Sequence, residues 1–452
     1  MPKNIKGKII LQCSIKALSP LHIGSGSDKR SDMDVLLDEN DQPYIPATSF
    51  IGVLKRSLEL KDSDKQNYKN DIDNFWGYIK DKDGRQSCFC CSDLVCSNKS
   101  PEIVIRDGIK INDKTGIVED KGKYDYEIVE RGSDFDLNME FTFTDSDEQF
   151  VKKMVSTIYA ELIKNNIKIG AKTNNGFGEI QLDKNNETAI RIFDFSQKQD
   201  VYDWLVNKGL NSKIISKDQT LKKLGEPFEI VNSSRLVIDA FLKLKNSIII
   251  RSYSNIPEMP DSTHIKSLDN WVLTGSTIKG AIRARANRIV NTLGKSEEII
   301  QQLFGHVDDK NRSKNAIKGR LLVKETVLPE YIAEQQTRIK IDRFTGGTIN
   351  AALFDSMPLF INSNDKALKI EIIVENCKDS WAGLLLLVLK DLWTGDLAIG
   401  GEKNIGRGVF EGVVATVNYN NSLIKIDKDF ANITEKDKEL LESYVTALNQ
   451  EG

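Results

Sequence analysis

The chain has 452 residues and a formal net charge of −3, with 40% hydrophobic and 29% charged residues. This length is too great for one typical domain and suits two domains of roughly 200–225 residues each. The composition excludes low-complexity disorder. Because the chain has no overall basic excess, any contact with nucleic acid must come from local basic clusters.

Targeting segments and disulfides are not expected either. No apolar stretch of signal-peptide length follows the charged residues 1–8. The longest apolar run, Leu384 to Leu389, is far shorter than a membrane span. Six cysteines in a chain of this length do not suggest a disulfide scaffold and fit a reducing compartment. We therefore expect a cytoplasmic protein without a membrane partner.

Four segments recur in the same order along the chain, each separated from its copy by 228 to 230 residues. The pairs are Pro46–Gly52 with Thr274–Gly280, Phe75–Gly77 with Leu303–Gly305, Ile109–Gly116 with Ile339–Gly346, and Ile169–Gly178 with Ile399–Gly408. Four collinear matches at one spacing indicate a tandem duplication. We predict a first module over residues 1–190, a linker over 191–230 with a short helix near 201–210, and a second module over 231–452.

Each half shows the same predicted order of elements. Alternating apolar residues predict opening strands at 8–18 and 236–244. Helices are expected at 50–59 and 278–292, later strands at 137–143 and 370–374, and second helices at 150–165 and 381–393. A glycine loop and a closing strand then end each half. This is the split βαβ order of a ferredoxin-like fold. We therefore predict an α+β protein with two tandem ferredoxin-like, RRM-like domains, into which hairpins at 106–131 and 328–354 are inserted.

The motif set resembles the RAMP superfamily of CRISPR-associated proteins, in particular the backbone subunit of type III effector complexes. The resemblance covers nearly the whole chain. It rests on residues 20–26 (PLHIGSG), 32–38 (DMDVLLD), 44–52 (YIPATSFIG), 75–77 (FWG) and the glycine loop 170–178. The second half repeats these motifs less completely, with residues 261–266 (DSTHIK) where residues 32–37 stand in the first.

The resemblance implies where target RNA is cut. In the family, the cleavage residue is an aspartate that precedes an apolar strand and a basic helix. This position falls on Asp32 in the first half and on Asp261 in the second, with Asp34 as a rival to Asp32. The second half departs from the family pattern, because His264 stands where an aliphatic residue is usual. The inserted hairpins would act as thumbs that wedge the guide–target duplex open.

Glycine loops and basic helices are the candidate guide-RNA contacts. Glycines allow positive φ and close backbone approach, and helix N-termini favour phosphate. Tight connections and solvated faces are the alternatives for these segments. The candidate RNA-binding residues are Ser49, Lys55, Gly170, Lys172, Gly176, Gly178, Thr277, Lys279, Arg283, Gly400, Lys403, Gly406, Arg407 and Gly408.

Four cysteines within nine residues form a further cluster, namely Cys88, Cys90, Cys91 and Cys96. Their spacing is not that of a standard zinc ribbon. A structural zinc site is one interpretation, and a cysteine-rich buried strand is the other.

The resemblance implies a guide-RNA-binding backbone subunit that cleaves complementary target RNA. A carboxylate can position a divalent ion, and Mg²⁺ is the cation expected for this step. The expected partners of the subunit are guide CRISPR RNA, target RNA and other type III subunits. Three alternatives stay open: a non-catalytic structural subunit of the same complex, an endoribonuclease that processes guide RNA, and a two-domain scaffold that binds no nucleic acid.

Overall fold

The structure is a computed structural model that describes residues 4–26, 31–80, 83–98, 101–112, 115–183, 188–206, 222, 224–231, 234–253, 259–307, 316–362, 366–429 and 432–451. The chain forms two compact units. Unit 1 comprises residues 1–105, 126–173 and 177–231, and unit 2 comprises residues 106–125, 174–176 and 232–452. Unit 2 therefore includes two short segments from the first half of the sequence.

Unit 1 is built on an antiparallel sheet with the strand order β12–β1–β11–β7. Its strands are β1 (Gly7–Ala17), β7 (Phe89–Cys91), β11 (Asp134–Phe143) and β12 (Ile180–Leu182), with β13 (Ala189–Asp194) beside β1 on the same edge as β12. Counted along the chain, the four core strands have the spatial order 4-1-3-2. This is the sheet order of a ferredoxin-like module.

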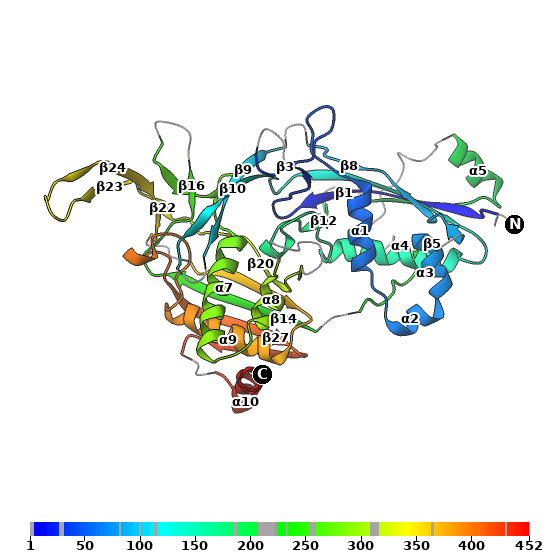
Figure 1. Cartoon of the computed structure of the whole chain (residues 1–452). Coiled ribbons are helices and arrows are strands. Elements are labelled where there is room, and N and C mark those ends of the chain that lie inside the picture. Colours follow the sequence, from blue (N-terminus) through cyan, green and yellow to red (C-terminus); the bar gives the residue numbers. More distant parts are fainter. Residues whose placement is uncertain are drawn as a thin grey trace. The chain divides into compact units, whose positions relative to one another are not determined.

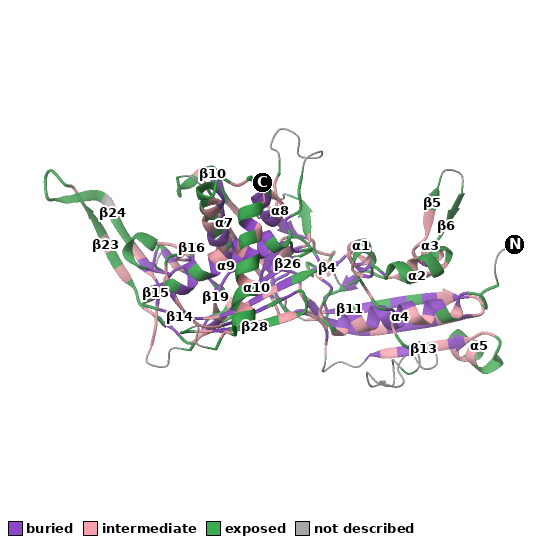
Figure 2. Ribbon diagram, turned by 90° about the horizontal axis from the view of Figure 1, so that it is seen from below, coloured by how far each residue is buried: buried purple, intermediate pink, exposed green. Residues whose placement is uncertain are grey.

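The helix α4 (Glu148–Ile163) packs on the buried face of this sheet, and α1 (Ala47–Ser57) adds Phe50 and Leu54 to the same core. Every second residue of β11 is buried, as expected for a strand with one covered face. Figure 2 shows α4 lying along β11, and most residues of α4 are buried. The remaining helices of unit 1 are α2 (Asp62–Asn67), α3 (Lys69–Trp76) and α5 (Lys198–Leu205).

Unit 2 repeats this architecture in a sheet with the order β20–β26–β14–β27–β28. The strands are β14 (Arg235–Leu244), β20 (Leu321–Val323), β26 (Leu368–Glu375), β27 (Phe410–Tyr419) and β28 (Ser422–Asp427). The first four strands again have the order 4-1-3-2, and β28 extends the sheet beyond β27. The two halves of the chain thus contain the same core.

The helices of unit 2 are α7 (Gly275–Thr292), α8 (Glu298–Phe304), α9 (Asp379–Thr394) and α10 (Glu435–Gln450). Figure 1 shows α7 and α9 side by side on one face of the sheet. The C-terminal helix α10 packs on α9 so closely that a Cβ atom on Gly383 would lie 2.2 Å from the carbonyl oxygen of Tyr444. This packing lets α9 be buried on most of its surface.

A long hairpin is inserted in each half. The first consists of β9 (Ile103–Ile111) and β10 (Val118–Val129), and the second of β23 (Gln336–Ile341) and β24 (Thr348–Met357). The second hairpin extends from the body of unit 2 and is exposed over most of its length (Figure 2). At its turn, Phe344 is 100% exposed. Such a side chain has no packing role within the described chain.

Short strands and two 3-10 turns complete the units. Those of unit 1 are β2 (Gly24–Gly26), β3 (Asp34–Val35), β4 (Tyr44–Ile45), β5 (Tyr78–Lys80), β6 (Asp83–Arg85) and β8 (Leu94–Val95). Those of unit 2 are β15 (Ser247–Ile248), β16 (Arg251–Tyr253), β17 (Ser262–His264), β18 (Lys266–Ser267), β19 (Asn270–Leu273), β21 (Thr326–Val327), β22 (Ile332–Ala333) and β25 (Leu359–Phe360). The 3-10 turns η1 (Thr173–Asn175) and η2 (Lys403–Ile405) lie in the glycine loops.

The predicted fold class, two ferredoxin-like modules with inserted hairpins, is confirmed by these two sheets. The segment predicted as a linker, 191–230, is partly built into unit 1. Residues 191–194 lie in β13, and Leu224 and Phe228 are buried in the unit 1 core. The short helix α5 begins and ends earlier than predicted, and residues 207–210 of that prediction lie outside the described residues. No described helix is long and apolar enough to cross a membrane.

Candidate functional site

Asp32 lies in the connection between β2 and β3, and its side chain is exposed. The connection is attached to the second strand of the first hairpin, β10, through Glu127. The backbone N–H of Glu127 donates to the carbonyl oxygen of Met33 (2.9 Å), and the backbone N–H of Val35 donates to Oε2 of Glu127 (3.0 Å). These two bonds place Asp32 beside the base of the hairpin.

Glu127 is the residue that organises this site, and the sequence analysis missed it. Its side chain is buried, and its carbonyl oxygen also bonds Nδ1 of His22 at 2.7 Å. Burial lowers the pKa of His22, so this imidazole is neutral and donates from Nδ1. No signal in the sequence singles out Glu127, because it is one of four acidic residues in the strand segment 118–129 (VEDKGKYDYEIV).

Asp34, the rival candidate, is fully buried. Its Oδ1 accepts a hydrogen bond from Oγ of Ser31 at 2.6 Å. Buried carboxylates are hydrogen-bonded to stabilise local structure, and this one cannot reach an RNA strand at the surface. Asp34 therefore supports the loop that carries Asp32.

Asp261 occupies the corresponding place in unit 2. It is exposed and directly precedes β17, which pairs with the base of β24, the second strand of its hairpin. Its Oδ2 accepts a hydrogen bond from the backbone N–H of Asp355 in β24 (2.9 Å). Both aspartates thus lie at the base of an inserted hairpin, although the carboxylate of Asp261 is held by the backbone.

His264, the departure from the family pattern, is a buried packing residue. The N–H of Ile250 donates to its Nδ1 (3.2 Å), so Nε2 carries the proton and donates to the carbonyl oxygen of Val272 (2.9 Å). Burial lowers the pKa of His264 to about 4. Its neutral ring links β17 to β19 and to the segment between β15 and β16, so both ring nitrogens are already hydrogen-bonded to the backbone.

The two glycine loops have the same backbone conformation. Lys172 and Glu402 have φ of 57° and 55°, and Gly176 and Gly406 have φ of 86° and 82°. A 3-10 turn separates the two positions in each loop. The duplication therefore extends to individual backbone angles, and this supports the alignment of the four motif pairs.

Most loop glycines are required by protein packing. A Cβ atom on Gly178 or Gly408 would lie 1.9 or 1.8 Å from the carbonyl oxygen of Ile169 or Ile399. A Cβ atom on Gly170 would lie 2.4 Å from the carbonyl oxygen of His22, and one on Gly400 would lie 2.6 Å from that of Ile249. Close approach at these four positions is therefore to the protein's own backbone, and we do not assign them direct RNA contact. Among the loop glycines, Gly406 alone has open space around its Cα.

Glu402 lies at the centre of an arginine cluster in unit 2. It accepts hydrogen bonds or ion pairs from Arg407 Nε (2.7 Å), Arg338 (2.9 Å) and Arg251 (3.1 Å). Burial raises the pKa of Glu402, but the hydrogen bonds from Arg407 and Arg251 outweigh it and lower the pKa. Three cations around one anion leave this part of the loop positively charged.

Arg407 is the buried member of this cluster. It donates to Glu402, Ser247 and Gln336. With its guanidinium satisfied by the protein, Arg407 fixes the loop and does not face a ligand. Arg251 and Arg338 are more exposed, with side-chain exposures of 40% and 27%, and they were not among the predicted residues. In the first loop, Lys172 stands at the position of Glu402 and lies 4.0 Å from the ring centre of Tyr126.

The starts of the two basic helices differ. Oδ1 of Asp93 accepts a hydrogen bond from the N–H of Ala47 at 2.7 Å, so a negative charge already lies at the N-terminus of α1 near Ser49. At the start of α7, Thr277 is hydrogen-bonded to Thr274 through their hydroxyls (2.8 Å). Neither helix start is thus an open anion site of its own.

Charged residues further along these helices are better placed for RNA. Lys55 is exposed on α1, where its Nζ lies 5.9 Å from the ring centre of Trp76. On α7, burial and the neighbouring Arg283 lower the pKa of half-buried Lys279 to about 8. An anion bound beside Lys279 would raise this pKa again, because it favours the charged form.

The four clustered cysteines are not gathered around one point. Cys90 and Cys91 are neighbours in β7 and point to opposite faces, opposite Glu140 and Met139 of β11. Burial raises the pKa of Cys88 and of Cys91 to about 12, which keeps both as thiols. Across the described residues, no group of three or more His, Cys, Asp or Glu side chains is placed to hold a metal ion. Cys88, Cys91 and Cys96 pack with the unit 1 core, whereas Cys90 is exposed.

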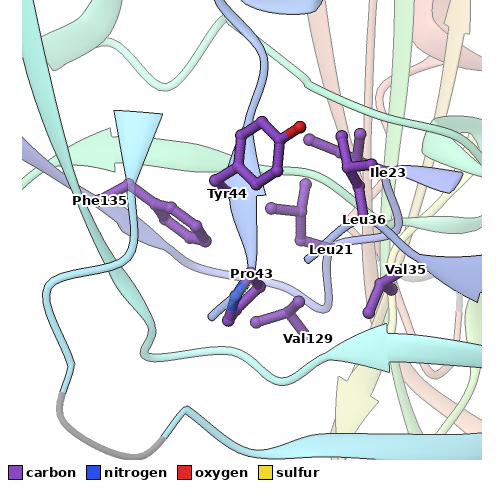
Figure 3. Close-up of a pocket in the computed structure, with 8 residues that line it drawn as sticks. All are labelled: Leu21, Ile23, Val35, Leu36, Pro43, Tyr44, Val129 and Phe135. Atoms are coloured by element: carbon purple, nitrogen blue, oxygen red, sulfur yellow. The ribbon is translucent and has the colours of Figure 1, made fainter. Parts of the chain in front are cut away.

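A small apolar pocket lies close to the Asp32 loop in unit 1. Figure 3 shows side chains from several segments facing one another there, among them Leu21, Val35, Val129 and Phe135. The space between them does not admit a water molecule. It is therefore part of the packing beneath the loop and not a ligand site.

Comparison with known proteins gives one family. A model of the RAMP superfamily matches residues 14–181 and 241–411, which is more than half of the chain and falls once on each half. No curated protein gives a significant match.

Proposed function

The chain belongs to the RAMP superfamily as a protein of two modules, and we propose that it is the guide-RNA-binding backbone subunit of a type III CRISPR interference complex that cleaves target RNA. Membership of the superfamily implies a CRISPR-associated subunit that binds RNA. The observation that carries the finer proposal is that each module presents one exposed aspartate, Asp32 or Asp261, at the base of its inserted hairpin.

Lysine and arginine side chains at the glycine loops and basic helices would bind the phosphates of the guide RNA. The proposed phosphate contacts are Lys55 and Lys172 in the first half and Arg251, Lys279, Arg283, Arg338 and Lys403 in the second. A single strand is bound in this way because each neutralised phosphate releases condensed counterions. Such local clusters explain how a chain with a net charge of −3 would bind RNA.

Cleavage would follow from strand geometry beside the aspartate. The hairpin bends the target strand so that a 2′-oxygen lies in line with its own phosphorus. This oxygen attacks, the bond from phosphorus to the 5′-oxygen breaks, and the products carry a 2′,3′-cyclic phosphate and a 5′-hydroxyl. The 2′-hydroxyl loses a proton and the leaving oxygen gains one. Asp32 would orient the strand and assist the first of these proton transfers.

A divalent cation was expected from the sequence, but the side chains around Asp32 do not form a metal site by themselves. No described His, Cys, Asp or Glu residues join Asp32 or Asp261 in a group of three. The proposed cleavage step therefore depends on the carboxylate and the bent strand.

Substitution of the aspartates in a guide-loaded complex tests the proposal. Asp32→Ala should lower cleavage at one position of a complementary RNA by at least about 100-fold, within the range for loss of an acid–base group. Asp261→Ala should act at a second position, and Glu39→Ala, which removes an exposed carboxylate nearby, should change neither. Unchanged cleavage at every position in the double Asp32→Ala/Asp261→Ala variant would favour the non-catalytic structural subunit.

A further inference from the structure

The tip of the first glycine loop is embedded in unit 2. Residues 174–176 belong to this unit, and Nδ2 of Asn174 donates to the carbonyl oxygen of Gly319 at 2.6 Å. A Cβ atom on Gly176 would lie 2.8 Å from backbone atoms of residues 323–325. One on Gly275 would lie 2.3 Å from the carbonyl oxygens of Asn175 and Val323. We call Gly275, Gly319 and residues 323–325 the socket, and residues 174–176 the first tip.

The second glycine loop has a tip of the same shape with no such cover. Residues 403–406 are all exposed in the part of the chain that the structure describes. A Cβ atom on Gly406 would meet no atom within 4 Å, whereas its counterpart Gly176 is buried. Ile405 is 54% exposed, so this apolar side chain is free to be covered by another surface. We call residues 404–406 the second tip.

We propose that the second tip docks into the socket of a RAMP module in another protein chain, as the first tip fills the socket within unit 2. The proposal rests on the proposed function, because it requires a complex of several RAMP subunits. Asn404 would donate to a carbonyl oxygen as Asn174 does, and Ile405 would lose its contact with water. Burial of an isoleucine in this way is favourable by roughly 25 cal/mol per Å² of apolar surface.

The partner is a different chain, because the first module has no open socket. Ala47 stands at the position of Gly275 in the repeated motif, and its Cβ occupies the space into which a tip carbonyl must come. Asp93 lies two residues after β7, at the position that Glu325 has after β20. Its side chain accepts a hydrogen bond from the N–H of Ala47. A second copy of this chain therefore cannot receive the second tip in the same way. The partner that fits has a glycine at the first residue of the helix that corresponds to α7.

Site-specific crosslinking tests this docking. The full-length chain is co-expressed with guide RNA and with candidate RAMP partner proteins, and a photoreactive phenylalanine derivative replaces Ile405. The matched control places the same group at Leu423, which is 69% exposed on β28. We expect crosslinks from position 405 to a different RAMP protein, near the glycine that begins its helix, and none of these from position 423. Crosslinks only to RNA, only to a second copy of this chain, or to nothing would overturn the proposal.

A second variant measures the contribution of the contact. Asn404→Asp combined with Ile405→Arg should reduce the co-purified RAMP protein at least about 10-fold, which corresponds to about 1.4 kcal/mol. The guide RNA retained per chain is measured in the same samples. Unchanged RAMP protein would contradict the docking, whereas an absence of RNA from the wild-type chain would contradict the proposed function.

Discussion

At the scale of single residues, the glycine loops depend on positions where no side chain fits. Gly178 and Gly408 combine a positive φ with a carbonyl oxygen less than 2 Å from the place of a Cβ atom. Gly406 has a similar φ of 82° but free space around it. Substitutions at Gly406 and Gly408 therefore separate the cost of a positive φ from the cost of a steric clash.

Gly408→Ala should lower the free energy of unfolding of unit 2 by at least about 2 kcal/mol more than Gly406→Ala. The control variant Gly406→Ala should cost only about 1 kcal/mol, since it meets the unfavourable φ alone. In Gly408→Ala the chain must also move Ile399, whose N–H donates to the carbonyl oxygen of Gly408. Urea titration of both variants measures the difference, and equal losses would contradict the steric explanation.

His264 predicts a pH dependence of stability. Its pKa is lowered by burial from 6.5 to about 4 in the folded chain. Between these values the unfolded chain binds a proton that the folded chain does not, so stability should fall as the pH decreases from 6.5 to 4. The loss is on the order of 3 kcal/mol. In His264→Gln, which does not titrate, unfolding measured from pH 7 to 4 should show a flatter slope, and an unchanged slope would contradict this assignment.

At the scale of elements, the second hairpin ends in a turn that one side chain holds. Oδ1 of Asp342 accepts hydrogen bonds from the N–H groups of Phe344 (2.9 Å) and Thr345 (2.8 Å) and from the Thr345 hydroxyl (3.1 Å). These bonds lower the pKa of Asp342. The turn presents Phe344 to solvent in a fixed position, which suits the wedge that the family resemblance implies.

Asp342→Ala should loosen the turn without affecting the core. We expect faster tryptic cleavage after the exposed Arg343 and a change in unfolding free energy within about 0.5 kcal/mol, because the turn lies outside the core. Glu334→Ala, which removes an exposed acid at the base of the same hairpin, serves as control. A cleavage rate equal to that of the control would show that Asp342 does not order the turn.

The elements that were predicted well have a copy in the other half or a strong apolar period. The opening strands, the paired helices and the hairpins are of this kind. Helices α1 and α7 begin three residues earlier than predicted, because Pro46 and Thr274 are their N-cap residues. The strand β28 and helix α10 were not predicted, since neither has a copy in the first half.

The site was predicted only where its residues form a local motif. The glycine loops were identified by their repetition, whereas Asp32 and Asp261 follow from the family resemblance and stay a prediction. The roles of Glu127, Arg251 and Arg338 depend on strands that are distant in sequence. The burial of Asp34 and Arg407 could not be predicted from the sequence either, because a charged residue in a polar motif is normally exposed.

At the scale of the whole molecule, duplication explains both the fold and the distribution of charge. Each half forms its own 4-1-3-2 sheet and carries a long inserted hairpin, a glycine loop and an exposed aspartate at the base of that hairpin. Many of the basic residues are already paired within a unit, as Arg407 is with Glu402 and Arg285 with Asp391. RNA binding therefore depends on a small number of cations placed at repeated positions, and not on the net charge.

Sequencing the RNA that co-purifies with the full-length chain tests this account most directly. The account predicts RNA of defined length in which one end is constant and the remainder matches foreign sequences, as expected of a guide. The amount retained should fall in a variant that combines Lys172→Ala with Lys403→Ala, and should not change in Lys428→Ala, where the lost lysine is paired with Glu411. A chain that carries no RNA, or RNA of random length and sequence that these lysines do not affect, would contradict the account.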